Sequence, residues 1–277
     1  MINIKLNKLT KFLGGINMLG FIKNLVGGLA LISFTVVGGI ANSASCPKSG
    51  GILKYGVKAE PPTYDMHGTN SYAVMHFVAQ HYSTLLTFDW NKFPKLEGDV
   101  ADSWNVSSDG LTYTFKIKKG IKFHDGTPLT SKDVKATYDR LRNPPEGVIS
   151  VRKALFSSIS GITTPDDNTV VFKLSSPDAF MLDGFASPFN AIYSAKDIAK
   201  DPKWHLKNIN GTGPYKFVAH KKGESWKAEK FADFHHGDNC LDGTESFRIK
   251  KVAEPLIGGQ IMAEWRGTAP PERVLLK

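Results

Sequence analysis

The chain has 277 residues, of which 41% are hydrophobic and 22% charged, a composition typical of a globular protein that excludes disorder. Its net charge is +9, but four lysines lie before residue 46, where no acidic residue occurs, so +5 remains for the rest of the chain. The remaining lysines are scattered among acidic residues. A nucleic-acid partner is therefore not expected.

The N-terminal segment 1–45 predicts export. Four lysines are followed by the apolar run 25–41 and then by small residues, which is the pattern of a signal peptide. A retained transmembrane anchor of about 20 residues is the alternative. In both cases the chain after Cys46 is expected to lie outside the cytoplasm.

The two cysteines, Cys46 and Cys240, have three alternative fates. Cys46 follows small residues in the position of a lipoprotein cysteine, although Ser43 stands where a lipobox usually has leucine. Lipidation of Cys46, a disulfide between the two, and two unpaired thiols all remain open at this point.

The first predicted strand is 52–57, which the sequence Glu60-Pro61-Pro62 ends. A helix follows, capped by Asn70 or Ser71 and running to about Thr84. The residues at helical spacing are Tyr72, Met75, His76, Ala79 and either Tyr82 or Ser83.

Two β-hairpins are predicted next. The first has Trp104 and Val106 before a turn at Asp109-Gly110, and its second strand, 111–117, alternates so that one face is buried. The second has Ile159 and Ile162 before the turn TPDDNT and returns over 170–174.

The segment 119–141 combines a strand end, a turn and a helix. Thr130 is the predicted cap, with Asp133 completing a capping box. The apolar stripe of the helix comprises Val134, Tyr138 and Leu141, and Asn143-Pro144-Pro145 ends it. His124 and Asp125 are catalytic candidates, but no Ser or Cys nucleophile accompanies them, so we interpret them as a hydrogen-bonding pair of the turn.

The stretch FADFHHGDNC invites a metal interpretation. It brings together His235, His236, Asp238 and Cys240. Two adjacent histidines in an extended chain point in different directions and rarely bind one ion. No metal or other cofactor is therefore expected.

The sequence GTGPY, 211–215, is not a phosphate-binding loop, because the Lys-Ser/Thr pair and the helix start are lacking. Its glycines are expected to permit a close approach of two backbones.

Five ordered stretches give the chain a resemblance to the family 5 extracytoplasmic solute-binding proteins, the receptors of oligopeptide, dipeptide and nickel ABC importers. The stretches are GGILKYGVKAEPPTYDMHGT, YSTLLTFD, LEGDVADSWNVSSDG, LTYTFKIKKGIKFHDGTPLTSKDVKATYDRL and NGTGPYKFVAHKKGES. The resemblance runs from about Gly50 to the C-terminus.

The resemblance implies an α/β, periplasmic-binding-protein-like (type II) architecture of two hinged lobes. Chains of this family are usually much longer, so we expect the N-terminal portion only, with the second lobe largely missing. The source would be a truncated or frameshifted reading frame, or a deliberately short protein. The expected organisation is a signal peptide or membrane anchor (1–45), the first part of lobe I (46–87), a β-rich subdomain with the capped helix (88–175), the second part of lobe I (176–250) and the start of a crossing into lobe II (251–277).

The same resemblance implies a monomeric receptor without enzymatic activity. It would pass a small peptide or another small solute to an ABC permease, in the periplasm or on the outer face of the cytoplasmic membrane. In the family the loop after the motif 65–67 lines the cleft, so Asn70 and Tyr72 are the first candidates for ligand contacts, and Glu60 and Tyr64 are weaker ones. Helix capping for Asn70 and core packing for Tyr72 are the alternatives.

Two other functions are weighed against this one. The first is a membrane-anchored, non-catalytic interaction module that has lost ligand binding. The second is a metal-dependent extracytoplasmic enzyme that uses His124, Asp125 and the histidines around His235.

Overall fold

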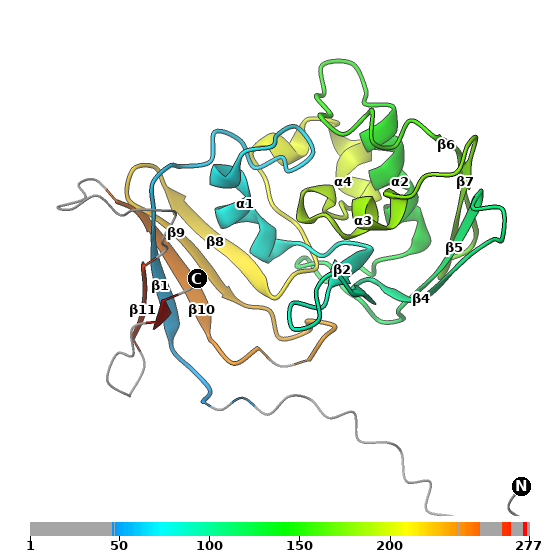
Figure 1. The fold of residues 1–277 in the computed structure, drawn as a ribbon. Coiled ribbons are helices and arrows are strands. Elements are labelled where there is room, and N and C mark those ends of the chain that lie inside the picture. The colour runs from blue at the N-terminus through cyan, green and yellow to red at the C-terminus, as the bar shows by residue number, and fades with distance from the viewer. Residues whose placement is uncertain (1–45, 47, 238, 250–261, 267–273, 276–277) are drawn as a thin grey trace, which may run out of the picture. The chain divides into compact units, whose positions relative to one another are not determined.

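A six-stranded sheet and a four-stranded sheet organise the chain in our computed structural model, which describes residues 46, 48–237, 239–249, 262–266 and 274–275. The predicted export segment 1–45 lies outside the described residues. The six-stranded sheet has the order β12-β11-β1-β10-β9-β8 (Figure 1). Its strands are β1 (Ile52–Val57), β8 (Tyr215–Lys221), β9 (Ser225–Lys230), β10 (Gly243–Arg248), β11 (Met262–Arg266) and β12 (Val274–Leu275).

The central strand β1 confirms the prediction for residues 52–57. It pairs in parallel with β10 and antiparallel with β11, and the other neighbours of the sheet are also antiparallel. Strands β11 and β12 thus place parts of the segment 251–277 in the same sheet as the first strand.

Helix α1 (Tyr72–Val78) begins where the sequence predicts, because the Ser71 side chain accepts a hydrogen bond from the Ala73 N–H. The helix is shorter than predicted, since a 3₁₀ turn, η1 (Ala79–His81), replaces its last turn. Of the residues at helical spacing, Tyr72 is exposed, and Met75 and His76 are partly buried. The buried residues of α1 are Val74, Phe77 and Val78, which pack against the six-stranded sheet.

The four-stranded sheet is antiparallel and has the order β4-β5-β7-β6. It contains both predicted hairpins, and Tyr113, Phe115 and Ile117 of β5 are buried as predicted. A small hairpin of β2 and β3 precedes it. The strands are β2 (Leu86–Phe88), β3 (Leu96–Gly98), β4 (Ala101–Val106), β5 (Thr112–Ile117), β6 (Ile159–Asp166) and β7 (Thr169–Leu174).

Helix α2 (Ser131–Arg142) confirms the prediction in detail. Thr130 and Asp133 form the capping box, and Asn143 is the C-cap. The preceding strand is not formed; only a single bridge joins Lys122 to Pro128, across the turn at Asp125-Gly126. The other helices and turns are α3 (Met181–Ala186), η2 (Pro188–Asn190), α4 (Ala195–Lys200) and η3 (Trp204–Leu206).

Helices α2, α3 and α4 lie together beside the four-stranded sheet (Figure 1). The predicted stripe of α2 is fully buried there, in a cluster of aromatic rings. Tyr138 contacts Phe156, Phe172 and Phe185, with ring centroids 5.1–5.2 Å apart. Burying one such side chain contributes about 1.5–3 kcal/mol, so this cluster is a main source of stability. In the part of the chain that the structure describes, no helix is both long and apolar enough to span a membrane.

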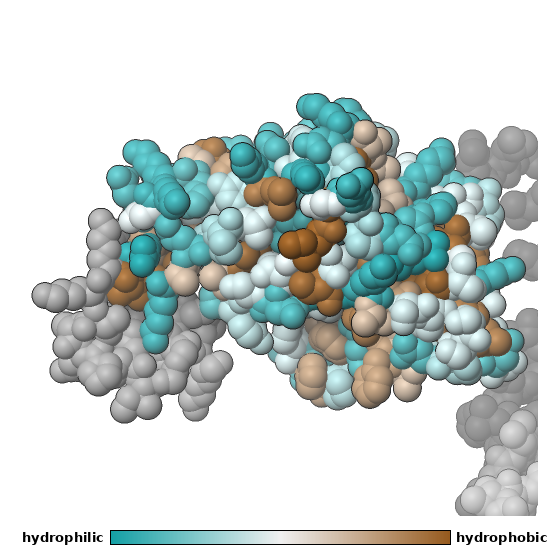
Figure 2. Space-filling model, turned by 90° about the horizontal axis from the view of Figure 1, so that it is seen from above, coloured by the Kyte–Doolittle hydropathy of each residue, from teal (hydrophilic) through white to brown (hydrophobic). Residues whose placement is uncertain are grey.

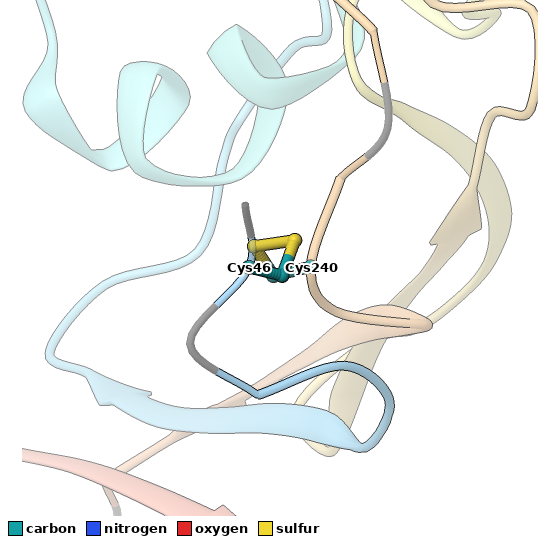
Figure 3. Close-up of a disulfide and its surroundings, with 2 residues drawn as sticks. All are labelled: Cys46 and Cys240. Atoms are coloured by element: carbon teal, nitrogen blue, oxygen red, sulfur yellow. A yellow bond between two sulfur atoms is a disulfide. The ribbon is translucent and has the colours of Figure 1, made fainter. Parts of the chain in front are cut away.

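Cys46 and Cys240 form a disulfide between the segment before β1 and the segment before β10 (Figure 3). Of the three alternatives for these cysteines, the structure shows the disulfide. A sulfur atom in a disulfide cannot carry a lipid thioether, so lipidation of Cys46 is incompatible with this arrangement.

Candidate ligand-binding site

A buried ion pair anchors the loop that carries the first candidate ligand contacts. Arg140 of α2 reaches Asp65 with its Nη2 atom 2.6 Å from Oδ2, and both side chains are at most 2% exposed. The second guanidinium nitrogen donates to His67 Nδ1 at 2.9 Å. The Tyr193 hydroxyl donates to Asp65 Oδ1 at 3.1 Å. The motif 65–67 is therefore a structural anchor.

The protonation states of this anchor follow from burial and charge. Burial lowers the pKa of His67 to about 3, so its imidazole is neutral at physiological pH. Burial alone would raise the pKa of Asp65, but the Arg140 guanidinium and the hydrogen bond from the His67 N–H lower it overall, and the carboxylate stays ionised. The neutral imidazole stacks on Tyr193 with ring centroids 4.0 Å apart.

The loop after the anchor is held from a second direction. The Val151 N–H donates to the His67 carbonyl at 3.2 Å, and the Arg152 Nη1 atom donates to the Thr69 carbonyl at 2.9 Å. The same guanidinium lies 4.5 Å from the ring centroid of Phe189. The side chains of the residues after Thr69 therefore project from a backbone that is held in place.

Asn70 ends this loop and Tyr72 begins α1 directly after it, and both residues are exposed. The Tyr72 side chain is 65% exposed and touches Phe189 only edge-on, with centroids 6.5 Å apart. Ser71, and not Asn70, caps α1. The alternatives of helix capping for Asn70 and core packing for Tyr72 are thus wrong, and both side chains are available to a ligand.

Glu60 and Tyr64 lie in a different environment. The Tyr64 hydroxyl is 2.8 Å from His220 Nδ1, and its ring packs edge-on against Trp226 at 5.0 Å. Glu60 accepts a hydrogen bond from the Gly223 N–H. Glu60 and Tyr64 therefore connect the chain after β1 to the β8–β9 hairpin. Within the described residues, no hydrogen bond or ring contact joins them to the loop of Tyr72.

Sequence reasoning missed the residues that pack around the loop before Tyr72. Arg152 and Phe189 support the loop, while Ile149 and Val151 are 68% and 42% exposed beside it. They lie far along the chain from Thr69, so no local signal identifies them. Figure 2 shows one face of the molecule, on which hydrophobic residues form small groups among hydrophilic ones.

His124 and Asp125 form the predicted hydrogen-bonding turn. The His124 Nε2–H donates to the Gly213 carbonyl at 3.0 Å, and Asp125 accepts hydrogen bonds from Thr127. Burial lowers the pKa of His124 to about 4. No serine or cysteine side chain is bonded to His124 among the described residues.

The glycines of the 211–215 segment make the expected close approach. A Cβ atom at Gly211 would lie 1.9 Å from the His81 carbonyl oxygen, and one at Gly213 would lie 2.5 Å from the His81 carbonyl carbon. Only glycine permits this contact, which also fixes the partners of His124.

His235 and His236 contradict the expectation that adjacent histidines point apart. The chain is not extended here, because consecutive turns join Phe231 to Phe234 and Phe234 to Gly237. Both Nε2 atoms are 2.9 Å from the same oxygen, Oδ1 of Asp99. Asp238 lies outside the described residues, and Cys240 is in the disulfide.

Known proteins are similar to this chain in sequence and in fold. A Brucella ovis protein named provisionally as an ABC transporter peptide-binding protein is 36% identical over 204 residues, which are 71% of this chain and 38% of the relative. The glutathione-binding protein GsiB of Pectobacterium atrosepticum is 37% identical over 147 residues, 53% of this chain and 28% of the relative. The solved structure of the oligopeptide-binding protein AppA of Bacillus subtilis, in complex with a nonapeptide, aligns with a TM-score of 0.67 and 28% identity.

The alignment with AppA covers 73% of this chain and 41% of AppA, so the chain spans well under half the length of these relatives. The model of the bacterial extracellular solute-binding proteins, family 5 (middle region), matches residues 95–254. That range contains the capped helix α2, the turn at His124 and the two glycines that approach His81. The chain therefore belongs to family 5 of the bacterial extracellular solute-binding proteins.

Proposed function

We propose that the chain forms the ligand-receiving wall of an extracytoplasmic receptor of an ABC importer, with small peptides as the solute. The observation that carries this proposal is the exposed pair Asn70 and Tyr72 on a backbone held by Asp65 and Arg152. An amide and a phenol hydroxyl bind peptide backbone groups without selecting side chains. The names of the relatives support peptides as the ligand class.

The placement of the receptor is part of the proposal. The segment 1–45 would direct export, and the Cys46–Cys240 disulfide suits an oxidising compartment. The four-stranded sheet and α2 would form the subdomain 88–175, flanked by the two parts of lobe I. The partner is an ABC permease, and the protein acts without catalysis.

Peptide binding to the oxidised protein tests the proposal. Thermal unfolding and calorimetry would be followed with dipeptides, tripeptides including glutathione, and longer peptides. A single wall buries less of a ligand than a closed cleft, so we expect weak binding with a measurable rise in Tm. Absence of any peptide-dependent rise up to millimolar concentrations would overturn the proposal and favour the interaction module.

A matched pair of variants locates the site. Tyr72→Ala should weaken peptide binding about fivefold or more, because a contact aromatic side chain contributes over ~1 kcal/mol. Phe180→Ala is the control, since Phe180 is similarly exposed, at 69%, but lies at the start of α3. Equal loss of affinity in both variants would remove Tyr72 from the site.

A further inference from the structure

Three side chains from two distant loops converge on one point. Asp99 lies between β3 and β4, whereas His235 and His236 lie between β9 and β10. Oδ1 of Asp99 is 2.9 Å from Nε2 of each histidine, and the three candidate donor atoms all lie within 4.8 Å of one another. This cluster is separate from the loop of Tyr72 and has no role in the proposed peptide site.

The cluster has a buried side and an open side. The His235 side chain is 5% exposed and that of Asp99 14%, but that of His236 is 38% exposed. Oδ2 of Asp99 accepts a hydrogen bond from the Thr84 N–H at 2.7 Å, which fixes the carboxylate. His235 also lines a cavity of about 700 Å³ that is open to solvent. The cluster is therefore positioned by the fold and remains accessible to an ion.

The histidine tautomers are compatible with ligation. Nδ1 of His235 is buried and has no hydrogen-bond partner in the structure. Ligation through Nε2 requires the proton to move to Nδ1, and because no acceptor among the described residues faces Nδ1, this buried N–H weakens metal binding. That transfer leaves the Nε2 lone pair facing Asp99, which is the form of imidazole that binds a metal.

Two imidazoles and one carboxylate form a donor set that suits borderline transition metals, Zn²⁺ above all. At Zn–ligand bonds of about 2.0–2.2 Å, donors around a tetrahedral ion lie about 3.3 Å apart. Small side-chain movements would bring the present donors to that spacing. Lys118 opposes binding, because its Nζ atom lies 2.7 Å from the Asp99 carbonyl oxygen. The nearby positive charge weakens the attraction of the site for a cation.

We propose that Asp99, His235 and His236 bind one divalent transition-metal ion such as Zn²⁺, with a fourth position open to water on the side of His236. The ion would replace the two histidine–carboxylate hydrogen bonds by three metal–ligand bonds. It would thereby clamp the loop after β9 to the loop before β4.

Calorimetric titration with Zn²⁺ tests this proposal on the full, oxidised chain without a polyhistidine tag, after treatment with a chelator and dialysis. We expect one equivalent to bind. His236→Ala should lower the affinity for Zn²⁺ at least about tenfold. Even residues that only hydrogen-bond a metal's direct ligands raise metal affinity about 10–100-fold, and a direct ligand contributes more. The control is His76→Ala on α1, which should bind Zn²⁺ like the wild type. Equal binding by His236→Ala and wild type would overturn the proposal, as would the absence of stoichiometric binding.

X-ray absorption at the zinc edge gives a second measurement that needs no variant. The wild-type complex should show two imidazole ligands and oxygen ligands at about 2.0–2.2 Å. A spectrum with one imidazole or none would place the ion elsewhere and overturn the site. Asp99→Asn keeps the shape of the side chain and should also weaken binding, and an unchanged affinity in this variant would exclude Asp99 as a ligand.

Discussion

Replacing Arg140 with leucine tests the buried ion pair that anchors the Tyr72 loop. The substitution leaves the Asp65 carboxylate buried without its charge partner and removes the hydrogen bond to His67. Breaking a buried pair from one side costs about 3–5 kcal/mol of unfolding free energy. For a chain of this size that corresponds to a fall in Tm of roughly 6–20 °C. Calorimetry and urea unfolding of the oxidised protein would measure it.

Lys135→Met on the same helix is the matched control. Lys135 pairs with Asp139 on the surface, with side chains 39% and 33% exposed, and such a pair contributes only about 0.3–0.5 kcal/mol. Adding Asp65→Asn to Arg140→Leu removes the uncompensated charge, so the double variant should lose less stability than the sum of the single losses. If Arg140→Leu costs no more than Lys135→Met, the ion pair is not what holds this loop.

Three further perturbations test other parts of the fold. Acid should destabilise it, because burial lowers the pKa of three histidines to about 3 or 4, below the unfolded value of 6.5; these are His67, His81 and His124. The histidine contribution to stability is then fully present above pH 6.5. Below that pH, the free energy of unfolding falls by about 1 kcal/mol for each histidine and each pH unit. Urea unfolding at pH 7 and at about pH 5.5 would measure this fall, and equal stability at the two pH values would contradict it. Replacing both disulfide cysteines with serine should cost roughly 2–5 kcal/mol, and an unchanged urea midpoint would speak against a structural role for the bond. Gly211→Ala should cost at least about 1–3 kcal/mol through its clash with His81, whereas Gly161→Ala, where a Cβ meets nothing within 4 Å, should cost little; equal effects would refute the close-contact argument.

Local signals predicted the parts of the fold that local interactions determine. The capping box of α2, the turn at Gly110 and the alternation in β5 all depend on residues within one or two turns of chain. Helix α1 shows where such signals end. Which of its faces is buried depends on Trp226 of β9, whose ring lies 5.4 Å from that of Phe77. A spacing of apolar and aromatic residues cannot reveal a partner so far along the chain.

In the candidate sites, too, local signals identify some residues but not their partners from distant parts of the chain. Asn70 and Tyr72 are proposed because they follow a recognisable motif, but Arg152 and Phe189, which support the loop, carry no signal of their own. His235 and His236 were noticed and then interpreted wrongly, because an extended backbone was assumed where consecutive turns occur. Their third partner, Asp99, is separated from them by 136 and 137 residues and became visible only in the folded chain.

The position of β1 has a consequence for the order in which the protein folds. This strand is synthesised first, yet both of its partners, β10 and β11, come from the end of the described chain. The hairpins of the four-stranded sheet join neighbouring segments and can form early, whereas β1 must wait for β10 and β11, which follow about 190 residues or more later. Contacts between such distant segments slow folding and leave strand edges exposed in the meantime. A chain that crosses a membrane unfolded would thus pair β1 only when β10 and β11 emerge.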